Sequence, residues 1–388
     1  MQPDEAFAIL KRGATQIISE KELREKLALG RPLRVKLGVD PTSADIHVGH
    51  AVVLRKLRQF QDLGHQAVLI IGDFTGMIGD PSGRSATRPH LTHKEVMENA
   101  QTYREQAFKI LDSTRTETVC NGDWFRSMSY EDVLRLNSRV TLQQMLQRED
   151  FRARVDKQHP IHAHEIQYPI MQGWDSVMVR ADVELGGTDQ LFNILVGRDF
   201  QREENQPQQV VLTMPLLEGL DGVKKMSKSL GNFVGVSEPP AGMFGKIMSI
   251  SDELMKRYYE LVLGRDLPKG ANPVEAKKQL AFEIVQTYHS KDVAEKTLAD
   301  WNARFSQKRL DEADLPEFAA LNDEAVTIVA AAYSQGFQIQ KSRADVSRLI
   351  KQGSVQLDGT KIVDPKSKVA LKPGQILRLD KTHAVRIK

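Results

Sequence analysis

Cysteine is almost missing from this chain. A single residue, Cys120, occurs in 388 positions, so no internal disulfide can form and metal sites built on cysteine pairs are excluded. A reducing compartment is the expected environment of a protein with so little cysteine. We therefore predict a cytoplasmic protein with no protein-bound metal.

Long apolar runs are also lacking. Stretches such as residues 67–71 have the length of a strand, whereas a membrane-spanning helix needs about 18 apolar residues or more. Residues 1–5 are acidic and do not show the basic-then-apolar order of a signal peptide. We expect neither a membrane segment nor a leader.

Two glycine-rich nucleotide motifs are absent as well. Neither Gly-x-Gly-x-x-Gly nor the Walker pattern Gly-x-x-x-x-Gly-Lys-Ser/Thr occurs, so nucleotide binding by those routes has no support. The chain does have 40% hydrophobic residues over 388 positions. That composition is typical of a globular protein, and the length fits two or three domains.

The charges are unevenly distributed. From residue 331 to the end, 12 lysines and arginines stand against 4 aspartates, a net +8, and since the whole chain carries +3 the preceding 330 residues carry −5. A small basic module on an acidic body indicates a polyanion held at one end. A solvated tail would carry the same charge, but alternating apolar positions within the module favour a folded unit.

Strand and helix patterns alternate over the first part of the chain. Buried strands are predicted at residues 34–39, 67–73, 116–120 and 210–214, and apolar residues at helical spacing predict a helix over 48–63. This alternation favours an α/β fold with a parallel sheet and right-handed crossovers. Ligands of such sheets bind at the carboxyl ends of the strands.

The pattern changes after residue 251. It is helical and charged to about residue 318, and a smaller α+β unit follows. That unit is predicted to contain helices at 324–335, ended by Gly336, and at 342–352, ended by Gly353, then strands around an Asp358-Gly359 turn and at 361–363 and 375–379.

The first strand runs into a segment with two histidines, His47-Val48-Gly49-His50. At positions i and i+3 of a first helical turn the two imidazoles face the same way, and the free N–H groups of a helix N-terminus favour phosphate. Gly49 leaves room for a flat ring to approach the backbone. The histidines could instead ligate a metal, although zinc helices usually supply an i, i+4 pair with a third ligand.

A lysine-rich segment lies between Gly222 and Gly231. The glycines predict a mobile loop rather than a helix. Lys225 and Lys228, three positions apart with a serine between them, can surround a polyphosphate and neutralise charge as it develops. A basic surface loop is the alternative.

Taken together, these motifs resemble a known family. His47-Val48-Gly49-His50 resembles the HIGH signature, and Lys225-Met226-Ser227-Lys228-Ser229 matches the KMSKS signature in every letter. Both motifs, in this order, resemble those of class I aminoacyl-tRNA synthetases. Residues 72–84, 168–175 and 185–190 are similar to the second-strand loop, the tyrosine-pocket helix and the adenylate-binding turn of the bacterial-type tyrosyl-tRNA synthetase family. The C-terminal unit resembles an S4 RNA-binding module.

The resemblance implies an organisation and an activity. It implies a Rossmann-like catalytic domain at 1–220 with a dimer-interface insertion at about 125–165, a KMSKS loop and linker at 221–246, an α-helical anticodon-binding domain at 247–320 and an S4-like domain at 321–388. The expected enzyme activates tyrosine with ATP, accompanied by Mg²⁺, and esterifies it to the terminal ribose of tRNA(Tyr). A homodimer formed around residues 133–154 is implied as well.

The resemblance also assigns roles residue by residue. Thr42, His47, His50, Lys225 and Lys228 are expected to be catalytic. The expected ATP-binding residues are Asp40, Gly49, Arg84, Arg88, Gly187, Asp189, Met226 and Ser227. Tyrosine would be bound by Lys36, Asp80, Tyr168, Gln172, Asp175 and Gln190, and tRNA by Arg343, Arg348, Lys351 and Lys361.

The residue types of the segment expected to bind tyrosine support that role independently of the resemblance; we call its residues Tyr168, Gln172 and Asp175 the tyrosine stripe. Tyr168, Gln172 and Asp175 fall at i, i+4 and i+7, on one face of a helix. Asp175 can accept a hydrogen bond from a phenol, and Asp80 with Tyr168 and Gln172 can hold an α-ammonium group. An ordinary helix side is the alternative, but a carboxylate that faces a cleft needs a partner.

One position departs from the family pattern. Many relatives have a tyrosine, a second contact to the substrate hydroxyl, where this chain has Lys36. Either Lys36 has a modified role or Asp175 works with another partner. A tryptophanyl-type synthetase and a non-catalytic RNA-binding relative are the alternative functions; the Tyr168 to Asp175 stripe and the basic module argue against the first, and the two intact motifs against the second.

Overall fold

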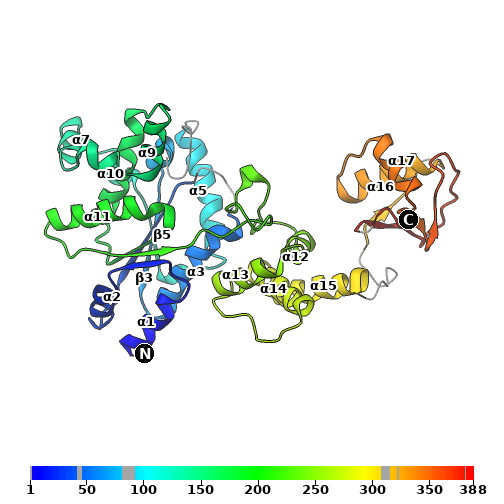
Figure 1. Cartoon of the computed structure of the whole chain (residues 1–388), viewed down its shortest axis with the longest axis horizontal. Helices are drawn as coiled ribbons and strands as arrows, with labels where there is room; N and C mark the ends of the chain where they lie inside the picture. Colours follow the sequence, from blue (N-terminus) through cyan, green and yellow to red (C-terminus); the bar gives the residue numbers. More distant parts are fainter. Residues whose placement is uncertain (1, 42–45, 81–91, 307–314, 321–322, 381) are drawn as a thin grey trace. The chain divides into compact units, whose positions relative to one another are not determined.

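The computed structural model describes residues 2–41, 46–80, 92–306, 315–320, 323–380 and 382–388. Its contacts divide the chain into two compact units, Met1–Ala294 and Glu295–Lys388, whose elements are labelled in Figure 1. Each unit has its own sheet and its own helices.

Within its described residues, the first unit contains a sheet of six strands in the order β1-β6-β5-β2-β3-β4. All neighbours are parallel except β1, which runs antiparallel to β6. The α/β class and the parallel sheet expected from the sequence are therefore confirmed. The strands are β1 (Gln16–Ile18), β2 (Arg34–Val39), β3 (Gln66–Ile71), β4 (Thr116–Cys120), β5 (Val183–Gly187) and β6 (Val210–Met214).

The helix α3 (Val48–Asp62) joins β2 to β3 and packs against both strands. His47 is its N-cap, as the motif predicted. The chain leaves the helix through Gly64, whose φ of +90° is unfavourable for any residue with a side chain. The chain reaches α3 from the carboxyl end of β2, and the residues at the helix start line the same cavity as the end of that strand.

Two further helices, α10 (Ala163–Met178) and α11 (Leu191–Glu203), pack closely against each other. A Cβ on Gly173 would lie 3.1 Å from the backbone nitrogen of Gly197, so glycine is needed where the two backbones meet. Helix α11 also packs on β5 and β6. This packing holds the Tyr168 to Asp175 stripe of α10 near the strand ends.

The remaining helices begin in the first unit, and the division between the units falls within the last of them, α15. They are α1 (Pro3–Lys11), α2 (Glu20–Leu27), α4 (Thr75–Ile78), α5 (His93–Ala107), α6 (Gly122–Phe125), α7 (Tyr130–Asn137), α8 (Leu142–Met145), α9 (Glu149–Asp156), α12 (Pro240–Met248), α13 (Asp252–Leu261), α14 (Pro273–Tyr288) and α15 (Lys291–Trp301). Short 3₁₀ turns occur at Ser113–Arg115, Thr188–Gln190 and Lys228–Leu230, and a π turn at Asn302–Ser306.

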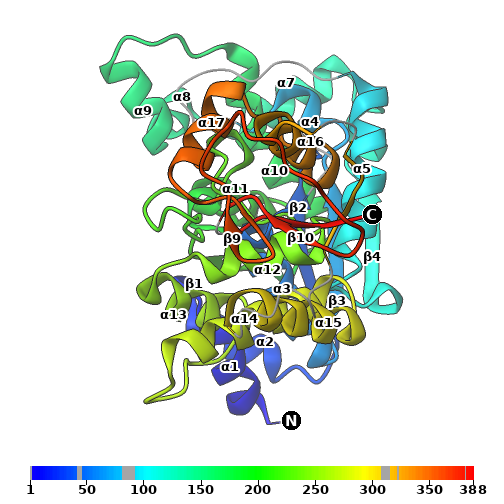
Figure 2. The ribbon, with the colours of Figure 1, turned by 90° about the vertical axis from the view of Figure 1, so that its right-hand side faces the viewer.

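The second unit is built on a sheet in the order β7-β11-β10-β8-β9, packed against two helices, α16 (Ala325–Phe337) and α17 (Arg343–Lys351), which lie side by side (Figures 1 and 2). Its buried core includes Phe318, Tyr333, Val346, Ile350 and Leu377. The strands are β7 (Glu317–Phe318), β8 (Gln356–Leu357), β9 (Thr360–Lys361), β10 (Ile376–Arg378) and β11 (Ala384–Ile387).

Two expectations for this unit were inaccurate. Helix α16 does not end at Gly336 but continues to Phe337, because Gln338 takes the left-handed conformation that ends it. Gly336 instead permits a close approach to β11, since a Cβ there would lie 3.0 Å from Val385. The strand β7 pairs with β11, although the sequence pattern placed residues 317–318 in the helical domain.

The division between the units also differs from the expected boundary at 320. The contacts place it between Ala294 and Glu295, and β7 is joined to the C-terminal sheet. Among the described residues, every helix is too short or too polar to cross a lipid bilayer.

Candidate active site

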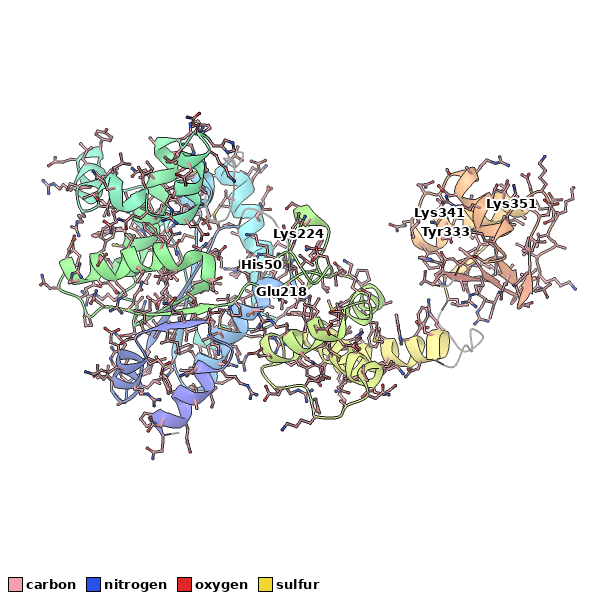
Figure 3. The ribbon with its side chains drawn as sticks, viewed as in Figure 1. His50, Glu218, Lys224, Tyr333, Lys341 and Lys351 are labelled. Carbon is pink, nitrogen blue, oxygen red and sulfur yellow. The ribbon has the colours of Figure 1, made fainter. Side chains whose placement is uncertain are left out.

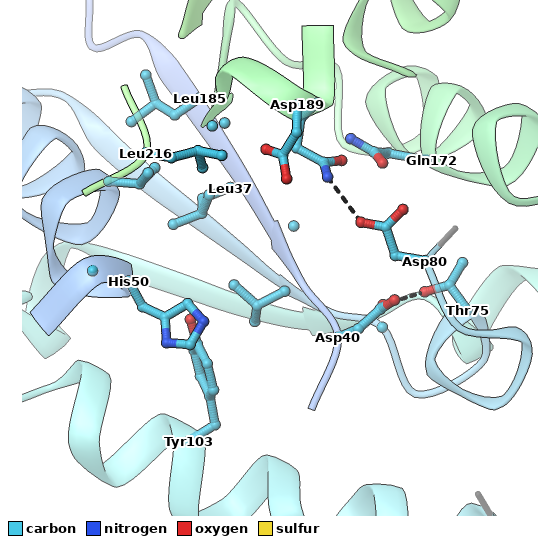
Figure 4. Close-up of a pocket in the computed structure, with 18 of the residues that line it drawn as sticks. Leu37, Asp40, His50, Thr75, Asp80, Tyr103, Gln172, Leu185, Asp189 and Leu216 are labelled. Atoms are coloured by element: carbon cyan, nitrogen blue, oxygen red, sulfur yellow. Dashed lines mark hydrogen bonds between the residues drawn. The ribbon is translucent and has the colours of Figure 1, made fainter. Parts of the chain in front are cut away.

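A cavity of about 790 Å³ opens where the parallel strands end (Figure 4). Its walls come from the end of β2, the start of α3, the middle of α10, the turn after β5 and the lysine-rich loop. These segments meet because the carboxyl ends of parallel strands lie at one edge of the sheet. The predicted residues that line it are Asp40, His47, Gly49, His50, Asp80, Tyr168, Gln172, Asp175, Gly187, Asp189, Gln190, Lys225, Met226 and Ser227.

Two of the other residues predicted for catalysis or for tyrosine binding, Lys36 and Lys228, do not line this cavity. Thr42, Arg84 and Arg88 lie outside the described residues, so their roles stay predictions.

The two histidines of the first motif stack, with ring centroids 3.7 Å apart and planes 19° from parallel. Burial lowers the pKa of His47 to about 2, and His50 and Lys228 act in the same direction. The pKa of His50 is lowered as well, by burial and then by the charge of Lys228, although its ring is open to the water of the cavity. Both imidazoles are neutral at pH 7 and offer hydrogen bonds rather than charge.

The first-turn amides of α3 are occupied in this structure. Val48 N–H donates to the carbonyl oxygen of Val234 at 2.9 Å, and His50 N–H donates to that of His47 at 2.9 Å. Gly49 N–H points at the thioether of Met226, 3.2 Å from Sδ. The expectation of free amides directed at phosphate is therefore wrong for this conformation, because the lysine-rich loop and the chain after it cover the helix start.

The lysine-rich loop is ordered by one asparagine. Asn232 accepts a hydrogen bond from Ser227 N–H at 2.9 Å and donates to Asp221 at 2.9 Å and to the carbonyl oxygen of Lys225 at 3.2 Å. Lys228 begins a 3₁₀ turn rather than a longer helix. The loop thus places Lys225, Met226 and Ser227 on the cavity wall while Lys228 stays just outside it.

Asp175 is buried at the opposite side of the cavity. Trp124 Nε1 donates to one carboxylate oxygen at 3.0 Å, and Asn121 Nδ2 donates to the other at 3.3 Å. Burial raises its pKa to about 7, while the charge of Lys36 and these two hydrogen bonds act against the rise. An ionised carboxylate has about four acceptor sites, so one held by two donors can still accept a hydrogen bond from a hydroxyl group.

The carboxylate of Asp40 accepts a hydrogen bond on each of its two oxygens. Tyr168 Oη donates to one of its oxygens at 2.8 Å. Thr75 Oγ1 donates to the other at 2.8 Å, a bond marked in Figure 4. Tyr168 comes from α10 and Thr75 from α4, so these bonds link the strand end to both helices. Asp40 is thereby fixed between the tyrosine stripe and the first motif.

A chain of amides links the remaining polar residues of the wall. Gln190 Nε2 donates to Asp80 at 2.8 Å. Asn193 Nδ2 donates to Gln172 at 2.8 Å and to Gln190 at 3.2 Å. The acceptor and donor directions of Gln172 and Gln190 are therefore fixed before any ligand arrives.

Asp189 stands on the turn after β5. Burial raises its pKa, and the neighbouring carboxylate of Asp80 adds to the rise. A Cβ on Gly187 would lie 2.6 Å from an Asp189 oxygen, so no side chain fits beside it. Asp189 also lines the cavity, where its carboxylate can accept hydrogen bonds.

Lys36 has a position that differs from the expected one. It is fully buried, and its Nζ donates to the Gln172 carbonyl oxygen at 2.8 Å and to Ser176 Oγ at 2.7 Å. It also forms an ion pair with Glu184 at 2.9 Å. Its ammonium group thus bonds only partners inside the protein, including two residues of α10. In this geometry it does not contact a ligand in the cavity.

The sequence reasoning missed several residues of this site. Thr75 and Asn121 line the cavity, and Trp124 holds Asp175. Asn121 directly follows β4, and a search of every predicted strand end, rather than of the first two, would have found it.

The four residues predicted to contact tRNA all belong to the second unit and are exposed. Arg343 forms an ion pair with Glu324 at 2.9 Å, and Arg348 with Asp345 at 2.7 Å. Figure 3 labels Lys351, the last residue of α17, and Lys341, which precedes that helix and whose Nζ lies 5.0 Å from the centre of the Tyr333 ring. Within the parts of the chain that are described, no three potential metal-ligating side chains come together.

Comparison with protein families places this site in a known context. Residues 28–314 match the model of the tRNA synthetases class I (W and Y). The chain is similar to the tyrosine–tRNA ligase of Oleidesulfovibrio alaskensis, with 50% identity over 100% of this chain and 99% of that protein. It is similar to the tyrosine–tRNA ligase of Syntrophotalea carbinolica, with 49% identity over 99% and 98% of the two chains.

Solved structures share the fold. A tyrosyl-tRNA synthetase from Archaeoglobus fulgidus, complexed with L-tyrosine, matches with a TM-score of 0.62 and 22% identity over 76% of this chain and 99% of its own. A C-terminally truncated mitochondrial tyrosyl-tRNA synthetase from Aspergillus nidulans matches with a TM-score of 0.63 and 20% identity over 78% and 99%.

Proposed function

The chain belongs to the class I tRNA synthetases of the tryptophan and tyrosine family, and from this premise we propose how its residues ligate tyrosine to tRNA. The reaction is that of a tyrosine–tRNA ligase: tyrosine and ATP form tyrosyl-adenylate and pyrophosphate, and the tyrosyl group then passes to the 3′-terminal ribose of tRNA. The observation that carries the substrate assignment is Asp175, a buried carboxylate with two fixed donors and room for a third.

Tyrosine would lie between α10 and the strand ends. Its phenol would donate to Asp175, because this carboxylate lines the cavity and the two donors Asn121 and Trp124 do not use all of its acceptor sites. Its α-ammonium would be held by Asp80, Tyr168 and Gln172, and its carboxylate by Gln190. The amide chain through Asn193 supports this arrangement because it fixes which atoms of Gln172 and Gln190 accept and which donate.

ATP would occupy the other half of the cavity. The adenosine would lie against Gly49 and His50, and the ribose would donate to Asp189 beside Gly187. Asp40, Met226 and Ser227 complete this wall, and Thr42, Arg84 and Arg88 are proposed for the phosphates. Because Met226 covers the Gly49 amide, the loop must shift when ATP enters.

The chemistry needs positioning and charge stabilisation rather than a protein nucleophile. A tyrosine carboxylate oxygen attacks the α-phosphorus in line, a new P–O bond forms, and the bond to the β-phosphate oxygen breaks as pyrophosphate leaves. Lys225 and Lys228 would neutralise the charge that gathers on the leaving pyrophosphate. His47 and His50, being neutral, would donate hydrogen bonds to phosphate oxygens without adding a competing charge.

Mg²⁺ is proposed to arrive with the ATP phosphates. The carboxylates on the wall, Asp40, Asp80 and Asp189, are spread among different hydrogen bonds and do not form a three-ligand cage among the described residues. This fits a cation held mainly by substrate phosphates and water. The cation would offset negative charge on the phosphates.

Partners follow from the same family assignment. We propose that the second unit holds tRNA(Tyr), since its residues 331–388 carry a net +8 and the exposed Arg343, Arg348, Lys351 and Lys361 suit phosphate contacts. A homodimer through the 133–154 region is proposed because Leu134 and Leu142 within it, and Tyr130 and Val155 beside it, are at least half exposed. A cytoplasmic location suits a tRNA ligase with a single cysteine.

ATP–pyrophosphate exchange tests the substrate assignment. Tyrosine should support rapid exchange, and phenylalanine should be poorer by about 10⁴–10⁵, tyrosyl-tRNA synthetases themselves being the measured case of this effect. Asp175→Ala should remove the preference or the activity. Strong exchange with tryptophan, or none with any amino acid, would overturn the proposal.

A further inference from the structure

The ion pair between Lys36 and Glu184 is completely enclosed in the first unit. Their side chains are 0% and 1% exposed, and the Lys36 nitrogen lies 2.9 Å from a Glu184 oxygen. Burying two charges costs desolvation that their attraction often does not recover, so such pairs are weak evidence for a stabilising role. The hydrogen-bond partners of the pair indicate a role other than stabilisation.

The pair is saturated with hydrogen bonds. The three N–H groups of Lys36 reach the Gln172 carbonyl oxygen, Ser176 Oγ and Glu184. Each oxygen of Glu184 has two partners: Gln172 Nε2 and Lys36 on one, Ser176 Oγ and Gln209 Nε2 on the other. No donor of Lys36 is left for a ligand, so the ammonium acts on the site through its position and charge.

The location of the pair connects it to tyrosine recognition. Lys36 comes from β2 and Glu184 from β5, and both bond residues 172 and 176 of α10, which flank Asp175 in that helix. The cation and the anion are therefore held against the same stretch of α10 as Asp175, near enough for both charges to act on its carboxylate. Asn121 and Trp124, at and just after the end of β4, present only neutral donors to that carboxylate.

Resting on the proposed function, we propose that Lys36 and Glu184 are positioning residues for the tyrosine hydroxyl: Lys36 keeps Asp175 ionised in the empty cavity, Glu184 opposes it, and their balance sets the pH below which tyrosine binding weakens. A phenol O–H donates well to a carboxylate and poorly to a carboxylic acid, which has given one oxygen to a proton. The neighbouring charges thus decide what fraction of the protein can receive the hydroxyl.

The charges around Asp175 support opposite effects of the two residues. The pKa of Asp175 is raised to about 7 by burial, lowered by the charge of Lys36 and raised by the charge of Glu184. In this chain the position of Lys36 therefore contributes a charge behind the carboxylate. The tyrosine that many relatives have at this position would instead contact the hydroxyl group of the substrate directly.

The test is the pH dependence of tyrosine binding between about pH 5.5 and 8.5, measured by calorimetry without ATP. For the unmodified chain the association constant should rise tenfold per pH unit below a midpoint near pH 7, the value for Asp175. Lys36→Met should move the midpoint up by about one unit or more, which is roughly tenfold weaker binding at pH 6. Glu184→Gln should move it down, and the double variant should lie between them.

A matched control is available on the same strand. Arg34→Met removes a β2 cation whose partner is Glu117, at 2.8 Å, and it should leave the midpoint unchanged. If Lys36 had only a structural role, Lys36→Met would lower the association constant by the same factor at every pH. A lower association constant with an unchanged midpoint pH would therefore overturn the inference. If Lys36→Met does not fold, as judged by thermal unfolding, Glu184→Gln and the double variant decide in the same way. An unmodified chain that does not bind tyrosine at any pH would refute the proposed function instead.

Discussion

The backbone N–H of Gly49 points at the thioether of Met226, 3.2 Å from Sδ and 177 residues away in the chain. This contact joins the two motifs on which the family assignment depends. Met226 is also buried, with 5% of its surface exposed. Its side chain is therefore the anchor that places the neighbouring Lys225 and Ser227 on the cavity wall.

Met226→Ala is expected to release this anchor. Truncating a buried methionine costs about 2–5 kcal/mol at its site, so the loop should spend most of its time undocked. We expect the rate of tyrosyl-adenylate formation to fall by at least about tenfold, with tyrosine affinity unchanged. Single-turnover kinetics with equilibrium binding checks this. Val223→Ala, at an 83% exposed position of the same loop, is the control and should behave like the unmodified chain; a normal rate for Met226→Ala would contradict the anchoring role.

Lys225→Ala and Lys228→Ala should affect the chemical step rather than tyrosine binding. The reason is that their ammonium groups meet most charge as pyrophosphate leaves. Losing such an interaction typically costs about 10²–10³ in rate, and single-turnover adenylation measures it. Lys224→Ala provides the comparison, because Lys224 is exposed and neither lines the cavity, as Lys225 does, nor acts on the pKa of His50, as Lys228 does. An equal loss of tyrosine affinity in the first two variants would show that the loop is structural.

The ionised side chain of Asp175 should lower the free energy of unfolding of the tyrosine-free protein at neutral pH. Its folded pKa of about 7 lies above the ordinary 3.8, so between these values the folded state binds more protons than the unfolded state, and stability falls as pH rises from about 4 to 7. Above that window the cost reaches at most about 4 kcal/mol. Asp175→Asn should therefore melt higher than the unmodified chain at pH 8, with a gap that closes toward pH 4. Thermal unfolding without tyrosine measures this, and a gap independent of pH would exclude the linkage.

Much of the catalytic fold could be predicted because its strands are buried runs. The bounds of β2, β4 and β6 agree with the sequence pattern. β1 was missed because three residues carry no periodicity, and β5 because its Gly186-Gly187 end has the composition of a turn.

The site was predictable only where neighbours in the sequence are neighbours in space. The stacking of His47 on His50 follows from helical spacing. The bond from Asn121 to Asp175 crosses 54 residues and depends on β4 lying beside β3. The partner of Lys36 could not be foreseen either, since nothing in the local pattern indicates that β5 would bring Glu184 next to it.

Removing the second unit should separate the two half-reactions. A chain ending at Ala294 keeps the six-stranded sheet of the described structure and the whole cavity wall, so tyrosyl-adenylate formation should survive. Charging of tRNA should fall steeply, because the exposed cations proposed to hold it are gone. Pyrophosphate exchange and tRNA charging, measured on the same preparation, check both expectations.

A full-length variant tests the same role without the risk that truncation disturbs the folding of the first unit. Lys351→Glu with Lys361→Glu reverses two exposed charges of the second unit, and it should weaken tRNA binding while leaving exchange intact. The salt dependence of tRNA affinity should also become shallower, since the variant neutralises fewer phosphates and so releases fewer counterions. Lys21→Glu changes an equally exposed lysine on α2 of the first unit and should do neither. Unimpaired charging by the truncated chain would show that the basic unit is not needed for tRNA, and the uneven charge of the sequence would then require another explanation.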